Sequence, residues 1–122
     1  MLKKYKKDDY DTKTYAPFKV FHQGDVISLT LDQDDFKYHA DGHVLNDIFE
    51  DRVKSRFSHY EKDTRFDSES GMFCVYIDSN TKKENIIDDL LKDFLSVFND
   101  SDAMRDYILR FYDVDINLKT QN

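Results

Sequence analysis

The strongest constraint on the fold is a predicted helix whose apolar face covers about half of its circumference. Apolar side chains recur at helical spacing, while Asp88, Asp89, Lys92 and Asp93 take the other half. The apolar members are Ile86, Ile87, Leu90, Leu91, Phe94, Leu95, Val97 and Phe98. An isolated helix with so wide an apolar face would aggregate, so we expect it to pack on a sheet.

A sheet is indicated by two patterns upstream of this helix. An unbroken apolar row runs from Met72 to Ile77, which predicts a central strand over residues 71–78 with both faces buried. Residues 17–33 read as a β-hairpin, because apolar and polar side chains alternate on both sides of Gly24.

Two more helices are predicted around these elements. Residues 43–54 place apolar side chains at helical spacing, but Arg52 falls inside the apolar arc, and we expect the helix to fray there rather than find a carboxylate partner. After Asn99-Asp100-Ser101 a further helix presents one stripe. The stripe consists of Met104, Tyr107, Ile108, Phe111 and Tyr112.

The remaining segments give weaker signals. Thr81 and Glu84 have the spacing of a capping box, which predicts that the wide-faced helix starts there. Residues 56–60 allow a short strand, and 114–118 alternate as an edge strand does. We therefore predict an α+β fold, in which a small antiparallel sheet (the hairpin plus strand 71–78) packs against two or three helices.

The length of 122 residues corresponds to one domain. Residues 1–15 lack periodicity and are expected to form a flexible or irregular arm, and residues 16–122 are expected to form the single α+β domain.

The charge distribution restricts the class of partner. The chain carries a net charge of −7, and the 22 acidic and 13 basic residues after Lys13 leave that part at −9. Such a body repels phosphate backbones, so we expect no direct nucleic-acid binding, and it attracts basic proteins. A plainer interpretation is that the charge only keeps a small domain soluble.

Location and chemistry are predicted mainly from missing signals. No apolar run has membrane-spanning length, and no apolar stretch follows the N-terminal lysines, so a cytoplasmic location without membrane contact is expected. Gly24, Gly42 and Gly71 stand too far apart for a phosphate-binding loop, and Cys74 lies in an apolar run. We therefore expect neither catalysis nor a cofactor.

One alternative is a small ligand- or metal-binding domain. His39 and His43 stand four residues apart with Asp41 between them, and His59 follows downstream. Histidines four apart on a helix can bind zinc, but Asp41-Gly42 is typical of a turn and no third ligand is evident, so we predict no metal site.

Acidic residues with aromatic neighbours suit a protein-binding surface, although a solvated loop is the plainer interpretation of residues 34–38. They occur in the polar segment after the hairpin and on the acidic faces of two helices. These candidates are Asp32, Asp34, Asp35, Phe36, Tyr38, Asp47, Glu50, Asp51, Asp88 and Asp89.

The order of several short segments carries a family resemblance. It consists of residues 16–19, Ser28–Leu31, Ile48–Arg52 and Phe66–Cys74, the last running into the amphipathic helix. Together they resemble the immunity protein 51 family of bacterial polymorphic toxin systems, over about residues 16–110. The chain departs from similar sequences in lacking an Asn-Gly-Tyr-Asp-Trp-like segment after Arg52.

The resemblance implies a small α+β protein that binds and neutralises a co-encoded toxin, often a nuclease. An acidic surface suits a basic toxin cleft. Besides the ligand-binding domain, a self-associating structural domain that uses its Phe- and Tyr-rich surface is the other alternative. The sequence leaves the oligomeric state open.

Overall fold

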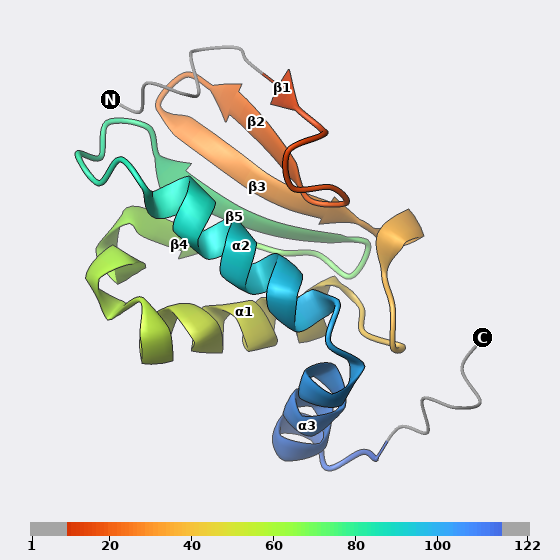
Figure 1. The fold of residues 1–122 in the computed structure, drawn as a ribbon. Helices are drawn as coiled ribbons and strands as arrows, with labels where there is room; N and C mark the ends of the chain where they lie inside the picture. The colour runs from red at the N-terminus through yellow and green to blue at the C-terminus, as the bar shows by residue number, and fades with distance from the viewer. Residues whose placement is uncertain (1–9, 116–122) are drawn as a thin grey trace.

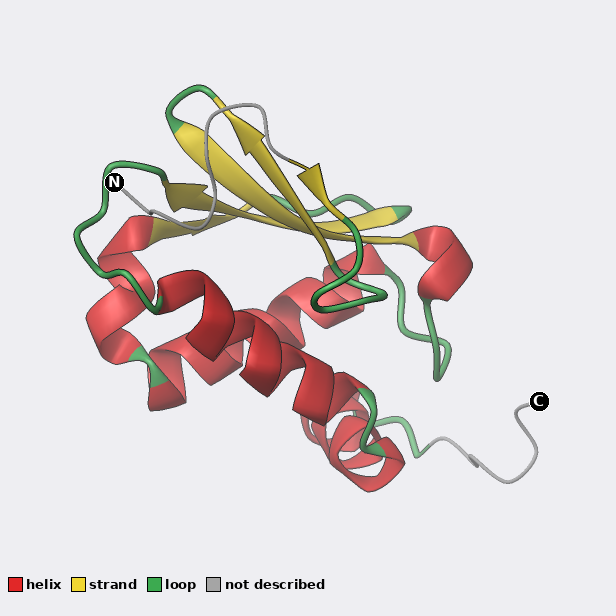
Figure 2. Ribbon diagram, turned by 45° about the horizontal axis from the view of Figure 1, so that its top comes forward, coloured by secondary structure: helices red, strands yellow, loops and turns green. Residues whose placement is uncertain are grey.

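The computed structural model describes residues 10–115 as a five-stranded antiparallel sheet with three α-helices on one side of it (Figures 1 and 2). The strand order is β1-β2-β3-β5-β4, and Figure 2 shows none of the described helices over the opposite face. This confirms the predicted α+β fold.

The strands are β1 (Tyr10–Asp11), β2 (Lys19–Gln23), β3 (Val26–Asp32), β4 (Thr64–Phe66) and β5 (Met72–Asp78). The helices are α1 (Gly42–Arg56), α2 (Ile86–Phe98) and α3 (Ser101–Tyr112), with short 3-10 helices η1 (Gln33–Asp35) and η2 (Ser58–Asp63).

The predicted hairpin is β2–β3, and it turns at Gly24. This residue has φ +57°, which glycine adopts with little cost, at the first position of the two-residue turn. β3 pairs with β5 along its whole length, from Val26–Asp78 to Asp32–Met72. β5 also pairs with β4, so the predicted central position of this strand is confirmed.

The expected N-terminal arm joins the sheet from Tyr10 onward. Tyr10 pairs with Phe21 across β1 and β2, and their rings meet edge to face with centroids 5.1 Å apart. Tyr15 is buried in the core. The first nine residues of the expected arm lie outside the described part of the chain.

The core lies between the sheet and helices α1 and α2, and phenylalanine rings fill its centre. Phe49 of α1 stacks on Phe94 of α2 with centroids 4.6 Å apart, and both contact Phe73 of β5. Phe18 makes ring contacts from the segment before β2. Because each ring is almost fully buried, these contacts combine transfer from water with ring–ring attraction.

The start of α2 differs from the prediction. The helix begins at Ile86, because the Thr81 hydroxyl accepts a hydrogen bond from the backbone N of Lys83, two residues on, at 3.2 Å. The Lys83 ammonium then reaches the Asp63 carboxylate at 2.7 Å. A side-chain bond of this local kind favours a turn over a helix, so the capping-box prediction was wrong.

The strand predicted over residues 56–60 is also wrong. Helix α1 continues to Arg56, and η2 follows it. In a 3-10 helix, residues three apart lie on the same side. The rings of Phe57 and Tyr60 accordingly stack with centroids 6.0 Å apart, and only Tyr60 is fully buried.

The apolar stripe predicted for the last helix holds only over its first part. Met104 and Ile108 are buried, but Phe111 and Tyr112 are exposed, because α3 packs against the core only as far as Ile108. Val114 and Asp115 are not in a strand, and residues 116–118 of the predicted edge strand lie outside the described residues.

Gly42 does not form the turn that Asp41-Gly42 suggested. Asp41 caps α1 by accepting a hydrogen bond from the backbone N of Val44 at 3.0 Å, and Gly42 is the first residue of the helix. The Gly42 backbone N donates to the Ser70 carbonyl at 3.0 Å. A Cβ atom on Gly42 would lie 1.8 Å from the Glu69 carbonyl oxygen, so only glycine fits under the β4–β5 connection.

We predict that Gly42→Ala destabilises the fold by about 3 kcal/mol, although alanine is the better helix former. The reason is that the atoms it meets are backbone atoms, which have little freedom to move away. Urea unfolding monitored by circular dichroism measures the change. Gly71→Ala is the matched control, because a Cβ there would meet only the flexible Gln33 side chain at 3.2 Å. Equal stability of the two variants would contradict this account.

Candidate functional site

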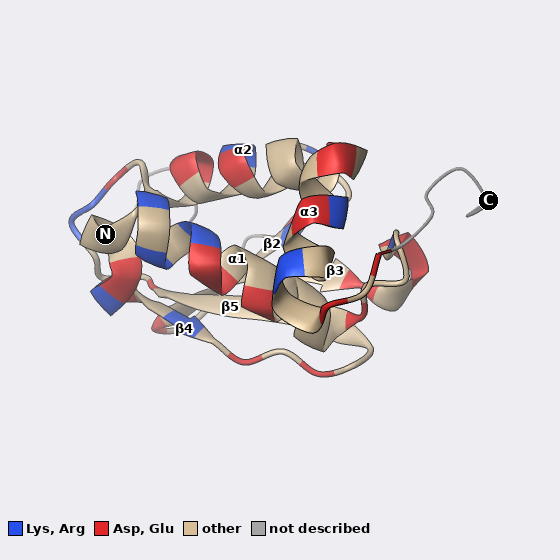
Figure 3. Cartoon of the chain, turned by 90° about the horizontal axis from the view of Figure 1, so that it is seen from below, with Lys and Arg blue, Asp and Glu red and all other residues tan. Residues whose placement is uncertain are grey.

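The acidic residues predicted to bind a partner lie in three separate places. Asp32 ends β3, Asp34 and Asp35 lie in η1, and the other five lie on α1 and α2. Figure 3 shows acidic segments on all three α-helices, interleaved with basic ones. The structure therefore does not gather all the predicted carboxylates on a single element.

The segment after β3 is less open than the sequence suggested. The Asp32 carboxylate pairs with the Lys19 ammonium at 2.6 Å. Phe36 and Tyr38 are part-buried against the core, and the Tyr38 ring meets Phe98 of α2 with centroids 6.3 Å apart. Burial and the nearby Asp100 carboxylate raise the pKa of the Tyr38 phenol. Of the three acidic residues, Asp34 is exposed and the other two are partly buried.

The acidic residues of α1 meet the end of α3. Asp47 accepts a hydrogen bond from the Tyr112 hydroxyl, and Asp51 pairs with the Arg110 guanidinium at 3.4 Å. Glu50 lies 3.9 Å from the Lys54 ammonium one turn along the helix. Burial, followed by the hydrogen bond to Asp47, raises the pKa of the Tyr112 phenol above its usual value. This face thus combines carboxylates with an aromatic side chain.

The acidic residues of α2 hold tyrosines from distant segments. Asp88 accepts a hydrogen bond from the Tyr15 hydroxyl, and Asp89 accepts one from the Tyr60 hydroxyl. Burial, and then the Asp89 carboxylate, raise the pKa of Tyr60 to about 12. These two carboxylates therefore tie α2 to the segment before β2 and to η2.

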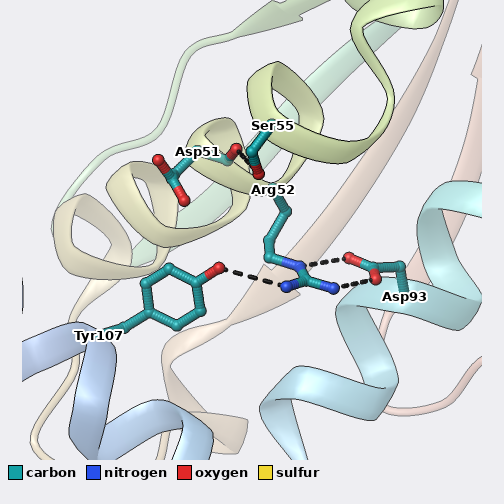
Figure 4. Close-up of polar contacts among 5 residues, drawn as sticks. All are labelled: Asp51, Arg52, Ser55, Asp93 and Tyr107. Carbon is teal, nitrogen blue, oxygen red and sulfur yellow. Dashed lines mark hydrogen bonds and ion pairs between the residues drawn. The ribbon is translucent and has the colours of Figure 1, made fainter.

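Helix α1 does not fray at Arg52, so that prediction was wrong. The Arg52 guanidinium donates to both carboxylate oxygens of Asp93 on α2, at 2.8 Å from Nε and 2.5 Å from Nη2. Figure 4 shows the Tyr107 hydroxyl of α3 on the other side of the guanidinium, 3.3 Å from Nη1. Both ionic side chains are mostly buried, and the hydrogen bonds to Asp93 keep the pKa of Arg52 above its usual value. This contact joins the three helices.

The three exposed histidines do not converge. His39 and His43 lie near the start of α1, and His59 lies beyond its end, about 20 Å away at the rise of an α-helix. Among residues 10–115, no group of three or more His, Cys, Asp or Glu side chains could hold a metal ion. His22, on β2, is buried, and its Nδ1 has no hydrogen-bond partner.

Sequence reasoning missed the exposed end of α3. Six large apolar side chains are exposed within the described range, and four of them lie in or just after the last turn of this helix. They are Leu109, Phe111, Tyr112 and Val114. The helical spacing of Phe111 and Tyr112 indicated burial, and only the position of α3 shows otherwise.

The segments that carry the family resemblance serve the fold. Ile48 and Phe49 lie in the core, and residues 66–73 span the end of β4, the β4–β5 connection and the start of β5. Within this connection the Ser68 hydroxyl donates to the side-chain oxygen of Asn46 at 2.6 Å and accepts from the Cys74 backbone N at 2.9 Å. These residues of the resemblance therefore shape the domain, while Asp51 in the same stretch as Ile48 and Phe49 pairs with Arg110 at the surface.

Comparisons with other proteins do not identify the chain: no family model, curated protein or solved structure matches it. None of the helices formed by residues 10–115 is long and apolar enough to cross a membrane.

We predict that Arg52→Met lowers the free energy of unfolding by about 3 kcal/mol, because it leaves the mostly buried Asp93 carboxylate without its cation. Chemical denaturation provides the measurement. Lys54→Met, which removes a solvent-exposed cation from the same helix, should change the stability by less than about 0.5 kcal/mol. The Arg52→Met/Asp93→Leu double variant should recover much of the loss, and failure to recover it would assign the effect to lost packing of the arginine stem.

Alkaline pH should destabilise the protein through Tyr60. Its pKa is raised from 10.0 to about 12 in the folded state, so the unfolded chain ionises first. The stabilising contribution is complete below pH 10 and is lost as the pH rises toward about 12. Tyr60→Phe should reduce the fall in the free energy of unfolding across this interval, measured by urea titration at each pH. Tyr10→Phe controls for the loss of one phenol, and an unchanged slope in Tyr60→Phe would refute the assignment.

Proposed function

We propose that this protein is an immunity protein that binds a co-encoded basic toxin and blocks it. The main observation behind this proposal is the surface formed by α1 and α3. There the Asp47 and Asp51 carboxylates lie beside exposed aromatic side chains of α3. The net charge of −7 and the resemblance to the immunity protein 51 family support the same proposal.

An inhibitor of this kind works by occupying the positively charged cleft of its target. The long-range field of an acidic body speeds the encounter, and close charge pairs then slow dissociation. The internal bonds to Tyr112 and Arg110 hold Asp47 and Asp51 in defined positions. Less side-chain entropy is then lost on binding, which favours affinity.

Co-expression tests the proposal directly. The toxic domain encoded beside this chain is expressed in a bacterial host with and without the chain, and growth is measured. We expect growth to be restored only when this protein is present and a one-to-one complex can be purified. Continued growth arrest without complex formation would contradict the proposal.

The salt dependence of association separates electrostatic steering from other causes of binding. We expect the association rate constant, measured by stopped-flow or surface-based kinetics, to fall by at least about tenfold from low salt to roughly 0.5 M salt. The dissociation rate constant should change less. An association rate independent of salt would be inconsistent with an acidic docking surface.

A further inference from the structure

The last turn of α3 presents apolar side chains that the domain does not cover. The exposed fractions are 42% for Leu109, 36% for Phe111, 38% for Tyr112 and 50% for Val114. We call these four residues the α3 patch. Every residue from 109 to 115 is exposed, so the four apolar side chains lie on one exposed segment at the end of the helix. A cluster of this kind marks an interaction site more often than singly exposed residues do.

Contacts inside the domain hold the aromatic members of the patch in place. The Tyr112 hydroxyl donates to the Asp47 carboxylate of α1, which leaves the exposed part of the ring available to a partner. The Arg110 guanidinium lies over the Phe111 ring, 4.9 Å from its centroid, and also pairs with Asp51. Anchored aromatic rings lose little conformational entropy on binding, and residues of this type dominate the affinity of protein interfaces.

The rim of the α3 patch is acidic. Asp47 and Asp41 lie near the Tyr112 phenol, and Asp113 lies between Tyr112 and Val114. Figure 3 shows acidic segments of α1 and α3 on the same side of the molecule. Two cations are near, but each already has a carboxylate partner. The pairs are Arg110 with Asp51 at 3.4 Å and Arg105 with Asp115 at 2.7 Å.

We infer that the α3 patch is the apolar anchor of the toxin interface, and that its occupant is a basic protein surface with an apolar centre and a rim of Lys and Arg. This inference rests on the proposed function. Charge complementarity selects the occupant: Asp41, Asp47 and Asp113 attract such a rim, whereas a second copy would bring two acidic rims together. None of the four patch residues belongs to the acidic and aromatic candidates that the sequence indicated.

The test compares patch variants in binding to the purified toxic domain encoded beside this chain. Phe111→Ser and Leu109→Ser should each weaken the equilibrium binding by at least about tenfold, mainly through faster dissociation. Asp113→Asn removes a rim charge while keeping a residue that tolerates the left-handed backbone found there, with φ 54°. It should mainly slow association at low salt.

Matched controls lie on the other face and at the other end of the molecule. Met72→Ser removes an exposed apolar side chain from the sheet face that carries no helix, and Asp25→Asn removes a charge from the β2–β3 turn. Both should bind like the unmodified protein. Circular dichroism and thermal unfolding of every variant should show that the exposed substitutions leave the domain folded.

The outcomes separate the two levels of the proposal. If the unmodified protein neither binds nor rescues growth, the proposed function fails. If it binds but the patch variants bind equally well, only the assignment of the α3 patch is wrong. A dimer that Phe111→Ser converts to a monomer in sedimentation would assign the patch to self-association instead. A chain ending at Asp115 that binds at least about tenfold more tightly would show that the chain's own end competes for the patch.

Discussion

Burial of the apolar face of α2 against the sheet is the interaction on which the other elements depend. Phe94 contacts Phe49 of α1 and Phe73 of β5, so α2 covers the core on the side of the sheet that carries the helices. The carboxylates on the polar face of α2 bond to side chains at the edges of this helix–sheet interface. Asp88 and Asp89 hold Tyr15 and Tyr60, and Asp93 holds Arg52. Helix α2 therefore positions α1, with which it packs, and also η2 and the segment before β2.

These polar contacts change how the acidic composition is interpreted. From the sequence alone, the carboxylates of α2 are expected to face solvent or to form a binding surface. In the fold, each of the three accepts a hydrogen bond from another element, and the Asp93 contact is a charge-assisted pair. Negative charge still contributes to the long-range field, because a carboxylate bonded to a neutral tyrosine keeps its charge. The specific contacts of a partner are better sought where carboxylates and exposed rings lie together, at the junction of α1 and α3.

The comparison of α1 with α3 shows what spacing can and cannot predict. For α1, the apolar positions predicted the helix and its buried face, since Leu45, Ile48, Phe49 and Val53 are all buried. For α3, the same type of pattern predicted burial of Phe111 and Tyr112, yet both are exposed. Helical periodicity identifies one face of a helix, but it carries no information on how far along its axis another element covers that face.

Local sequence determined the β2–β3 hairpin at Gly24, the central strand β5 and the existence of α1, α2 and α3, because these follow from spacing within a few residues. The short strands β1 and β4 were not predicted. Tertiary structure decided which carboxylate meets Arg52, why Gly42 has no room for a Cβ atom, and where the apolar side chains of α3 remain in solvent. The partners involved are 41 residues away for Arg52 and 27 for Gly42. Such contacts arise only when packing brings distant segments together, and a local pattern does not contain that information.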